Sequence, residues 1–309
     1  MGSGFSELHG AGLIAVRGPD AITFLHAQLT SDVAGLPPLR TQYSGYCTPK
    51  GRVLATFLLW RTDDEVTLVL PESLGAELQT RLARYVLRSR VQLSASTEAL
   101  RLFGVWGSDA PDTLRQIVGK LPQTAHELVV AAAMRVARVP GDRFILAATA
   151  EEAEHVRDAL RSRMPEESEI AWLQCEIEAG VPRIVRKTQD QYVPQMLNFD
   201  LIGAVSYTKG CYPGQEIVAR MHYLGRLKQR MYRIYVSGPD APAAGDALYS
   251  AEFGHEQASG GILYAAPSGG GHDALAVIQT SSARSGALRW KAPDGPAVQL
   301  KPLPYEIPD

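Results

Sequence analysis

The segment from Lys209 to Glu216, KGCYPGQE, holds the most unusual arrangement of reactive side chains in this sequence. Gly210 and Gly214 permit positive φ angles and close backbone approach, so the turn can direct several amide N–H groups into one pocket. Lys209 lies two residues before Cys211, and a cation close to a thiol lowers its pKa and favours the reactive thiolate. The alternative is a glycine-rich turn around a structural cysteine, because free cysteines are usually core residues.

Two carboxylates, Glu176 and Glu178, lie at the end of a predicted helix that Gly180 closes. The helix macrodipole disfavours a carboxylate at this end, which indicates another use, such as accepting ligand N–H groups in pterin or purine recognition. A solvated helix end explains the same pattern. The loop that follows carries the amides Gln195 and Asn198, which offer paired donors and acceptors to a heterocycle or simply form turns.

Positive charge gathers in one run of an otherwise near-neutral chain: Arg220, His222, Arg226, Lys228, Arg230 and Arg233. Such a run binds an anionic tail or a short stretch of nucleic acid, or forms a solvated face near a domain junction. Close to Cys211, Arg220 would also favour the thiolate. The earlier segment from Cys47 to Arg52 offers Lys50 and Arg52 to an anion, or carries them only as charges flanking a buried strand.

Composition excludes several classes of protein. The 309 residues carry a net charge of -2, whereas a general nucleic-acid coat needs a large positive excess. Three widely spaced cysteines argue against a disulfide scaffold and cannot supply four thiolates to one cluster, so no metal site is predicted. Phosphate-loop and dinucleotide-binding glycine motifs are absent from the sequence. No apolar stretch of ~18 residues occurs, so no membrane span is expected.

The elements that must position these residues follow strand-strand-helix-strand order, which favours an α+β fold over an alternating parallel sheet. Helices are predicted over 71–87, 110–119, 150–162 and 168–179, and a short one starts at Gly18-Pro19-Asp20. Strands are predicted over 12–17, 52–60, 65–70, 91–93, 100–106, 128–139 and 143–148. Residues 181–225 are predicted to be mostly loop. From Met231 onward, short alternating segments between Gly/Pro/Ser turns predict a small β-barrel.

The motif KGCYPGQEIVAR closely resembles the signature of the YgfZ family, folate-binding proteins of iron–sulfur cluster maintenance. Further segments resemble the same family over the whole chain, weakly in 95–165 and 235–295. They are Gly18-Pro19-Asp20, Gln28–Val33, Cys47 with Lys50–Arg52, Trp172-Leu173, Ile177–Pro182, Val193–Gln195, Asn198 and Pro302–Tyr305.

The resemblance implies the fold of the glycine-cleavage T-protein, a tetrahydrofolate-dependent aminomethyltransferase. We therefore expect a folate-binding region over 1–228, built of two interleaved α+β units with the inner one at about 45–110, and a barrel over 229–309. Glu178 matches the T-protein glutamate that contacts the pterin. The positions of the T-protein Asp pair, one of them catalytic, hold Ala55 and Thr56, which argues against aminomethyl transfer because the assisting carboxylate is missing.

The resulting hypothesis is a cytoplasmic, monomeric protein that binds tetrahydrofolate or a one-carbon derivative and supports assembly or repair of iron–sulfur client enzymes. Cys211 is the expected essential thiol and Lys209 tunes it. Folate contacts are expected from Glu178, Gln195, Asn198, Gly210, Tyr212, Gly214, Gln215 and Arg220, with the basic run receiving the glutamate tail. Stable nucleic-acid or membrane binding is not expected. The alternatives are a folate-dependent one-carbon transferase or demethylase, and a thiol-based interaction module with a vestigial folate pocket.

Overall fold

The computed structural model describes residues 2–225, 227–254 and 257–308. The chain forms two compact units, Met1–Ser44 with Phe57–Trp172, and Gly45–Thr56 with Leu173–Asp309. The second unit therefore combines a short early segment with everything after Trp172. All the predicted site residues belong to this second unit.

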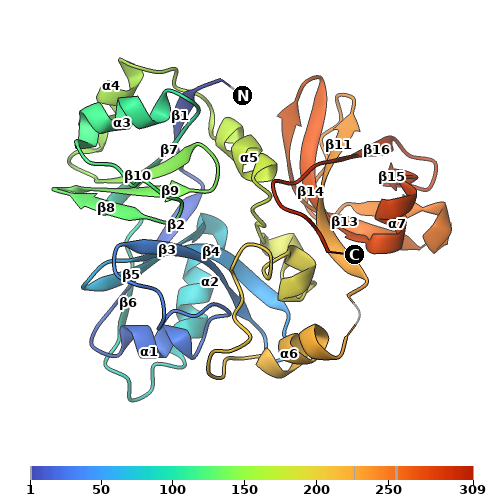
Figure 1. The fold of residues 1–309 in the computed structure, drawn as a ribbon, viewed down its shortest axis with the longest axis horizontal. Helices are drawn as coiled ribbons and strands as arrows, with labels where there is room; N and C mark the ends of the chain where they lie inside the picture. The colour runs from blue at the N-terminus through green and yellow to red at the C-terminus, as the bar shows by residue number, and fades with distance from the viewer. Residues whose placement is uncertain (1, 226, 255–256, 309) are drawn as a thin grey trace. The chain divides into compact units, whose positions relative to one another are not determined.

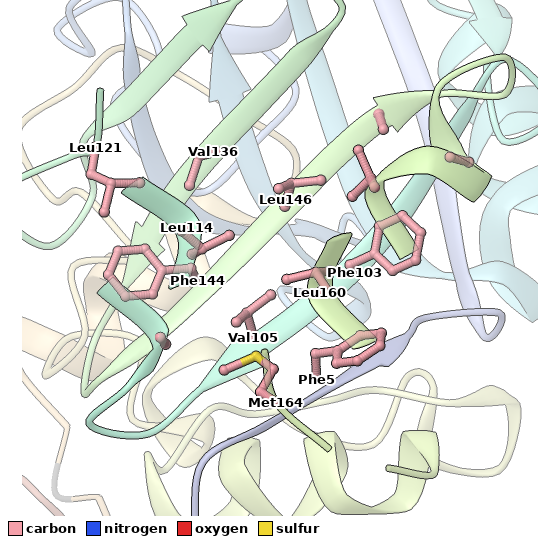
Figure 2. Close-up of a cluster of buried hydrophobic side chains, with 14 residues drawn as sticks. Phe5, Phe103, Val105, Leu114, Leu121, Val136, Phe144, Leu146, Leu160 and Met164 are labelled. Atoms are coloured by element: carbon pink, nitrogen blue, oxygen red, sulfur yellow. The ribbon is translucent and has the colours of Figure 1, made fainter. Parts of the chain in front are cut away.

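An antiparallel sheet in the first unit joins the N-terminal strand to four later ones (Figure 1). Its order is β1 (Gly4–Glu7), β7 (Leu100–Trp106), β10 (Arg143–Thr149), β9 (Met134–Val139) and β8 (Leu128–Ala131). Side chains alternate along a strand, so Phe103 and Val105 share the face that packs with Phe144 and Leu160 (Figure 2). Two helices complete this hydrophobic core, α3 (Ala110–Val118) and α4 (Ala153–Arg161).

A second sheet has the order β3 (Arg40–Cys47), β4 (Val53–Arg61), β5 (Glu65–Pro71), β2 (Ala11–Arg17) and β6 (Gln92–Ala95). Helix α2 (Glu72–Ala83) contacts β2 and buries Leu74, Leu78 and Leu82, which fall on one face because they recur every four residues. The short helix α1 (Ala21–His26) follows β2, with Asp20 as its N-cap residue.

A buried carboxylate connects the two sheets of the first unit. Glu65 forms an ion pair with Arg17 on the neighbouring strand and another, at 2.7 Å, with Arg135 of β9. The Thr67 hydroxyl donates a further hydrogen bond to Glu65 at 2.8 Å. Burial alone would raise the pKa of Glu65, but these hydrogen bonds and charges outweigh it and hold the pKa below its usual value.

Helical segments dominate the middle of the second unit. Helix α5 (Glu169–Glu178) carries the chain into this unit, and two 3-10 turns follow, at Arg186–Thr188 and Pro194–Leu197. Helix α6 (Gln215–Tyr223) comes directly after the Lys209–Gly214 segment. The early segment packs on this part of the chain through main-chain hydrogen bonds from Val53 to Tyr192 at 2.8 Å and from Asp190 to Val53 at 3.0 Å.

Six strands close into the C-terminal barrel. Its order is β11 (Gln229–Ser237), β14 (Gly271–Gln279), β13 (Ala258–Ser268), β12 (Ala247–Ser250), β15 (Leu288–Trp290) and β16 (Ala297–Lys301). Alternate side chains of β11 and β14, including Ile234, Val236, Ala276 and Ile278, fill the interior. A 3-10 turn (Ala251–Phe253) and helix α7 (Thr280–Ser285) connect barrel strands.

The predicted α+β class and C-terminal barrel are confirmed. One local prediction is wrong. Residues 128–139 form two strands, not one, because the chain turns at Ala132, whose φ is 49°. The prediction that residues 181–225 are mostly loop is confirmed; helix α6 and two 3-10 turns lie within that segment. Among the described helices, none is both long and apolar enough to span a membrane.

Candidate functional site

The loop that carries Cys211 rests on the early segment of the second unit. Gly214 has a φ of 82°, and a Cβ atom there would lie 2.5 Å from the Thr48 carbonyl oxygen and 2.6 Å from the Gly51 Cα. Gly51 faces it with a φ of 70°. Only glycine fits such a contact between two main chains, so the glycines fix the place of the loop.

Side-chain and main-chain hydrogen bonds complete the loop. The Lys209 N–H donates to the Ser206 hydroxyl at 3.3 Å, and the Gln215 amide donates to the Lys209 carbonyl at 3.3 Å. The Gln215 N–H also bonds the Tyr212 carbonyl at 3.1 Å, where α6 begins. These bonds hold the backbone on both sides of Cys211.

Cys211 is exposed, whereas Cys47 and Cys175 are buried. The Lys209 ammonium lies 4.9 Å from the ring centroid of buried Tyr212, a cation–π contact. Burial raises the pKa of the Cys47 thiol and keeps it protonated. The structure therefore leaves Cys211 as the thiol that a solvent-borne reagent or a protein partner can reach.

Tyr212 holds the Cys211 loop to the protein interior through its buried ring. Its ring is buried and its hydroxyl has no hydrogen-bond partner among the described residues. Burial, and secondarily the neighbouring Cys47, raises the pKa of this phenol, so it stays neutral. The aromatic ring thus supplies both a core contact and the surface over which Lys209 is held.

Gln195 and Asn198 use their amide nitrogens on the protein's own main chain. The Gln195 side chain is buried and donates to the Val218 carbonyl at 2.7 Å, which holds α6 to the Pro194–Leu197 turn. Asn198 has a φ of 57° and donates to the Met231 carbonyl of β11 at 2.8 Å. Both residues therefore position the loop and barrel, and their predicted folate contacts remain predictions.

Glu178 lies in a buried polar cluster built from α5 and the barrel. Its side chain is 37% exposed, and its Oε1 accepts hydrogen bonds from Gln174 at 3.3 Å and Arg233 at 3.4 Å. The same two donors bond Asp273 Oδ2 at 2.6 and 2.7 Å. We call Gln174, Glu178, Arg233 and Asp273 the Glu178 cluster.

Three buried atoms of the Glu178 cluster lack partners among the described residues: Gln174 Oε1, Arg233 Nε and Asp273 Oδ1. Buried polar atoms in native proteins are almost always satisfied, by protein, ordered water or a ligand. Two acceptors and one donor beside a half-exposed carboxylate match the mixed donors and acceptors of a heterocycle edge. The cluster thus combines donors and acceptors of the kind that recognise such a ring.

Of the partners of Glu178, only Gln174 could be predicted from local sequence. Gln174 lies one helical turn before Glu178, a spacing that brings side chains together. Asp273 follows His272 in a buried strand whose next five residues are apolar, and a buried carboxylate needs a partner.

The helix end at Glu178 is itself fixed by the C-terminal segment. Gly180 has a φ of 64°, and a Cβ atom there would lie 2.7 Å from the Tyr305 hydroxyl. That hydroxyl donates to the Gly180 carbonyl at 2.8 Å, and the Asn198 amide lies 3.5 Å from it. Tyr305 therefore ties together the two loops that flank the Glu178 cluster.

Ala55 and Thr56 offer no carboxylate to this unit. Ala55 is buried, and the buried Thr56 hydroxyl accepts a hydrogen bond from the Ile184 N–H at 3.1 Å. Thr56 thus serves the backbone that leads from α5 toward the loops.

The basic run separates in space. Arg220 is exposed on α6, and His222 stacks on Tyr207 with a ring-centroid distance of 3.7 Å. Arg230 is buried in a bidentate pair with Asp200 at 2.6 and 2.9 Å. Arg233 belongs to the Glu178 cluster, and Arg226 lies outside the described residues. The described members of the run therefore form no continuous cationic stripe.

Comparison with known proteins finds one matching family model and relatives that share a name. The GCVT N-terminal domain model matches residues 2–140. A "tRNA-modifying protein YgfZ" of Klebsiella pneumoniae (strain 342) is 29% identical over 96% of this chain and 91% of its own length. The protein of the same name from Sodalis glossinidius (strain morsitans) is 29% identical over 96% of this chain and 90% of its own.

A solved structure matches the fold. The glycine cleavage system aminomethyltransferase T from Bartonella henselae aligns with a TM-score of 0.79 over 98% of this chain and 86% of its own, at 17% identity. The T-protein-like fold expected from the sequence is confirmed, together with the closed six-stranded barrel. The likeness at this identity concerns the fold.

Proposed function

We propose that this chain, a homologue of the YgfZ proteins over nearly its full length, binds tetrahydrofolate and supports assembly or repair of iron–sulfur enzymes through Cys211. The Glu178 cluster is the observation that supports folate binding. The exposed Cys211, on a loop held by two close-packed glycines, supports the proposed role in iron–sulfur enzyme assembly or repair.

The Glu178 cluster fits a reduced pterin. A pterin presents adjacent N–H donors and ring acceptors along one edge, and a carboxylate accepts two such N–H groups. Glu178 would accept them, while Gln174 and Asp273 hold further unpaired acceptors and Arg233 an unpaired donor. Arg233 forms ion pairs with both carboxylates, Glu178 at 3.4 Å and Asp273 at 2.7 Å.

Bound tetrahydrofolate would supply a carrier for one-carbon groups. The rival function, one-carbon transfer or demethylation, needs a base or carboxylate at the folate nitrogens. Ala55 and Thr56 supply none, and the Thr56 hydroxyl is already engaged by Ile184. These residues favour a binding and supporting role over transfer.

Cys211 has the features of an interaction thiol. It is exposed, follows a lysine held over Tyr212, and sits between backbone positions fixed by hydrogen bonds. In the proposed role, Lys209 positions and electrostatically supports the thiol, Gly210 and Gly214 shape the turn, and Gln215 closes it. Tyr212 and Arg220 complete the surface presented to folate or a client enzyme.

The relatives are named as tRNA-modifying proteins. We propose an indirect part in tRNA modification, through iron–sulfur enzymes that act on tRNA. A net charge of -2 and a basic run divided between clusters are poorly suited to stable RNA binding. The proposed site of action is the cytoplasm, with the chain as a monomer.

Two experiments test the two halves. Calorimetric titration with tetrahydrofolate should give binding that Glu178→Gln weakens at least tenfold. Glu176→Gln, on the same helix but paired with Arg183 at 3.3 Å, is the matched control and should bind normally. Absence of binding to the unchanged chain refutes the folate proposal.

For the thiol, cells that depend on this protein should lose iron–sulfur enzyme activity with Cys211→Ala and Lys209→Ala. Thr208→Ala, an exposed neighbour, should retain it. Normal enzyme activity with Cys211→Ala contradicts the proposed role of the thiol. Appearance of a one-carbon folate product would instead support the transferase.

A further inference from the structure

A cavity of about 580 Å³ opens at one end of the barrel. Strand β11 begins there and β14 ends there, since Gln229 pairs with Gln279. Its lining residues include Leu227, Lys228, Arg230, Phe253, Thr280 and Arg284. None of the residues placed in the Glu178 cluster or the Cys211 loop is among them.

Strand geometry separates this cavity from the Glu178 cluster. Side chains alternate between the two faces of a strand, and β11 pairs with β14 without a register shift. Arg230 is therefore on the same face as Ile234 and Val236, which fill the barrel interior. Arg233 is on the opposite face, with Asp273. A ligand in this cavity would occupy a site of its own.

The charged residues among the described lining of the cavity are cationic. Lys228, Arg230 and Arg284 line it, and no acidic residue is among its described lining residues. Asp200 neutralises the charge of Arg230 and holds its guanidinium in place through two hydrogen bonds. Lys228 is exposed and lines the cavity.

Thr280 is held beside Lys228. The Thr280 N–H donates to the Lys228 carbonyl at 2.8 Å, so the two residues are fixed side by side by main chain. The Thr280 hydroxyl oxygen is buried and lacks a hydrogen-bond partner in the described part of the chain. A hydroxyl and an ammonium that reach the same point form a good donor pair for one anionic oxygen.

The cavity also has apolar lining residues. They are Phe253, Leu227 and Pro308. A cavity that combines convergent polar donors with apolar walls has the general character of a small-molecule site. Inorganic ions alone would leave these apolar residues without a contact.

We propose that this cavity binds a small organic anion, whose phosphate or carboxylate group meets Lys228 and Thr280 and whose apolar body contacts Phe253. Phosphate and carboxylate share the chemistry of several acceptor oxygens around a negative charge. The apolar body distinguishes the ligand from a free ion.

Binding of phenyl phosphate, benzoate and inorganic phosphate to the full chain, followed by calorimetry and NMR, tests the proposal. At least one of the two aromatic anions should bind, and the tighter one identifies the head group. Lys228→Glu should weaken that binding by about tenfold or more, because an attraction becomes a repulsion. Thr280→Val, which keeps the side-chain shape, should weaken it several-fold.

Lys301→Glu is the matched control. It makes the same charge change on the barrel, but Lys301 lies over the Tyr235 ring, outside the cavity lining. Binding should survive this change, and thermal melts should show all variants folded. The proposal is overturned if neither aromatic anion binds at millimolar concentration, if inorganic phosphate binds as tightly as phenyl phosphate, or if Lys301→Glu and Lys228→Glu weaken binding equally.

Discussion

Replacing Gly214 by alanine should dislodge the Cys211 loop. The added Cβ would meet the Thr48 carbonyl oxygen at 2.5 Å and the Gly51 Cα at 2.6 Å, distances that backbone atoms cannot relieve by a side-chain rotation. A residue with a side chain also pays about 1–2 kcal/mol to keep a left-handed φ of 82°. Overpacking against a rigid neighbour adds about 1–3 kcal/mol. The expected total is about 2–5 kcal/mol, enough to favour a displaced loop.

Gly203→Ala separates the two contributions. Gly203 has a comparable φ of 69°, but nothing lies within 4 Å of its would-be Cβ. It should therefore cost only the conformational part, about 1–2 kcal/mol. The difference between the two variants measures the contact with the Thr48–Gly51 turn.

Hydrogen exchange and urea unfolding provide the readout. In Gly214→Ala, amides of residues 45–56 should exchange faster at low denaturant and the unfolding midpoint should fall, whereas Gly203→Ala should leave exchange in 45–56 unchanged. Equal destabilisation in the two variants, with normal exchange in 45–56, would refute the reasoning that the glycine pair fixes the loop.

Three further predictions concern other residues. Glu65→Gln should lower the free energy of unfolding at pH 7 by about 2 kcal/mol, because hydrogen bonds to a charged group are lost. Its folded pKa is lowered, so this stabilisation is present above the unfolded pKa of about 4.3 and is lost as pH falls; the variant and the unchanged chain should converge in acid denaturation curves. An aromatic disulfide reagent should label one thiol rapidly in the native chain, and Cys211→Ser should abolish that fast phase; rapid labelling of buried Cys47 or Cys175 would contradict it. Tyr305→Phe should cost about 1 kcal/mol by thermal unfolding, since it removes the hydrogen bond to Gly180, and an unchanged melting temperature would argue against that bond.

Hydrophobic periodicity predicted most of the long elements. The helix over 71–87 corresponds to α2, whose buried leucines recur every four residues, and the alternation after Met231 predicted the barrel. Short barrel strands such as Ala247–Ser250 and Leu288–Trp290 went unpredicted because three or four residues carry too little pattern. Helix α6 was missed because Gly214, which begins it as N-cap, was interpreted only as a loop residue.

Local sequence predicts a site made of adjacent residues more readily than a site made of residues far apart in the chain. The Cys211 loop is made of adjacent residues, so glycine spacing and Lys209 were enough to identify it. The Glu178 cluster joins residues 99 positions apart, since Gln174 meets Asp273 only through the closure of the barrel. No local pattern contains that pairing, because it depends on which strand of the barrel lies beside α5.

The polar residues of the second unit also differ in what their side chains do. Gln195 and Asn198 looked as suitable for a heterocycle as Glu178, yet their amide nitrogens bond Val218 and Met231. Withdrawing them for a ligand would cost those buried hydrogen bonds, about 1–3 kcal/mol for each carbonyl left unpaired. Gln195 Oε1 and Asn198 Oδ1 also lack partners within the described residues, but both are acceptors. The Glu178 cluster differs because its atoms without partners include a donor, Arg233 Nε, as well as the acceptors Gln174 Oε1 and Asp273 Oδ1. Folate recognition should therefore depend more steeply on Arg233 and Asp273 than on Gln195. Titration of Asp273→Asn and Gln195→Met with tetrahydrofolate decides the order: a larger loss of affinity in Gln195→Met, with both variants folded, would contradict this assignment.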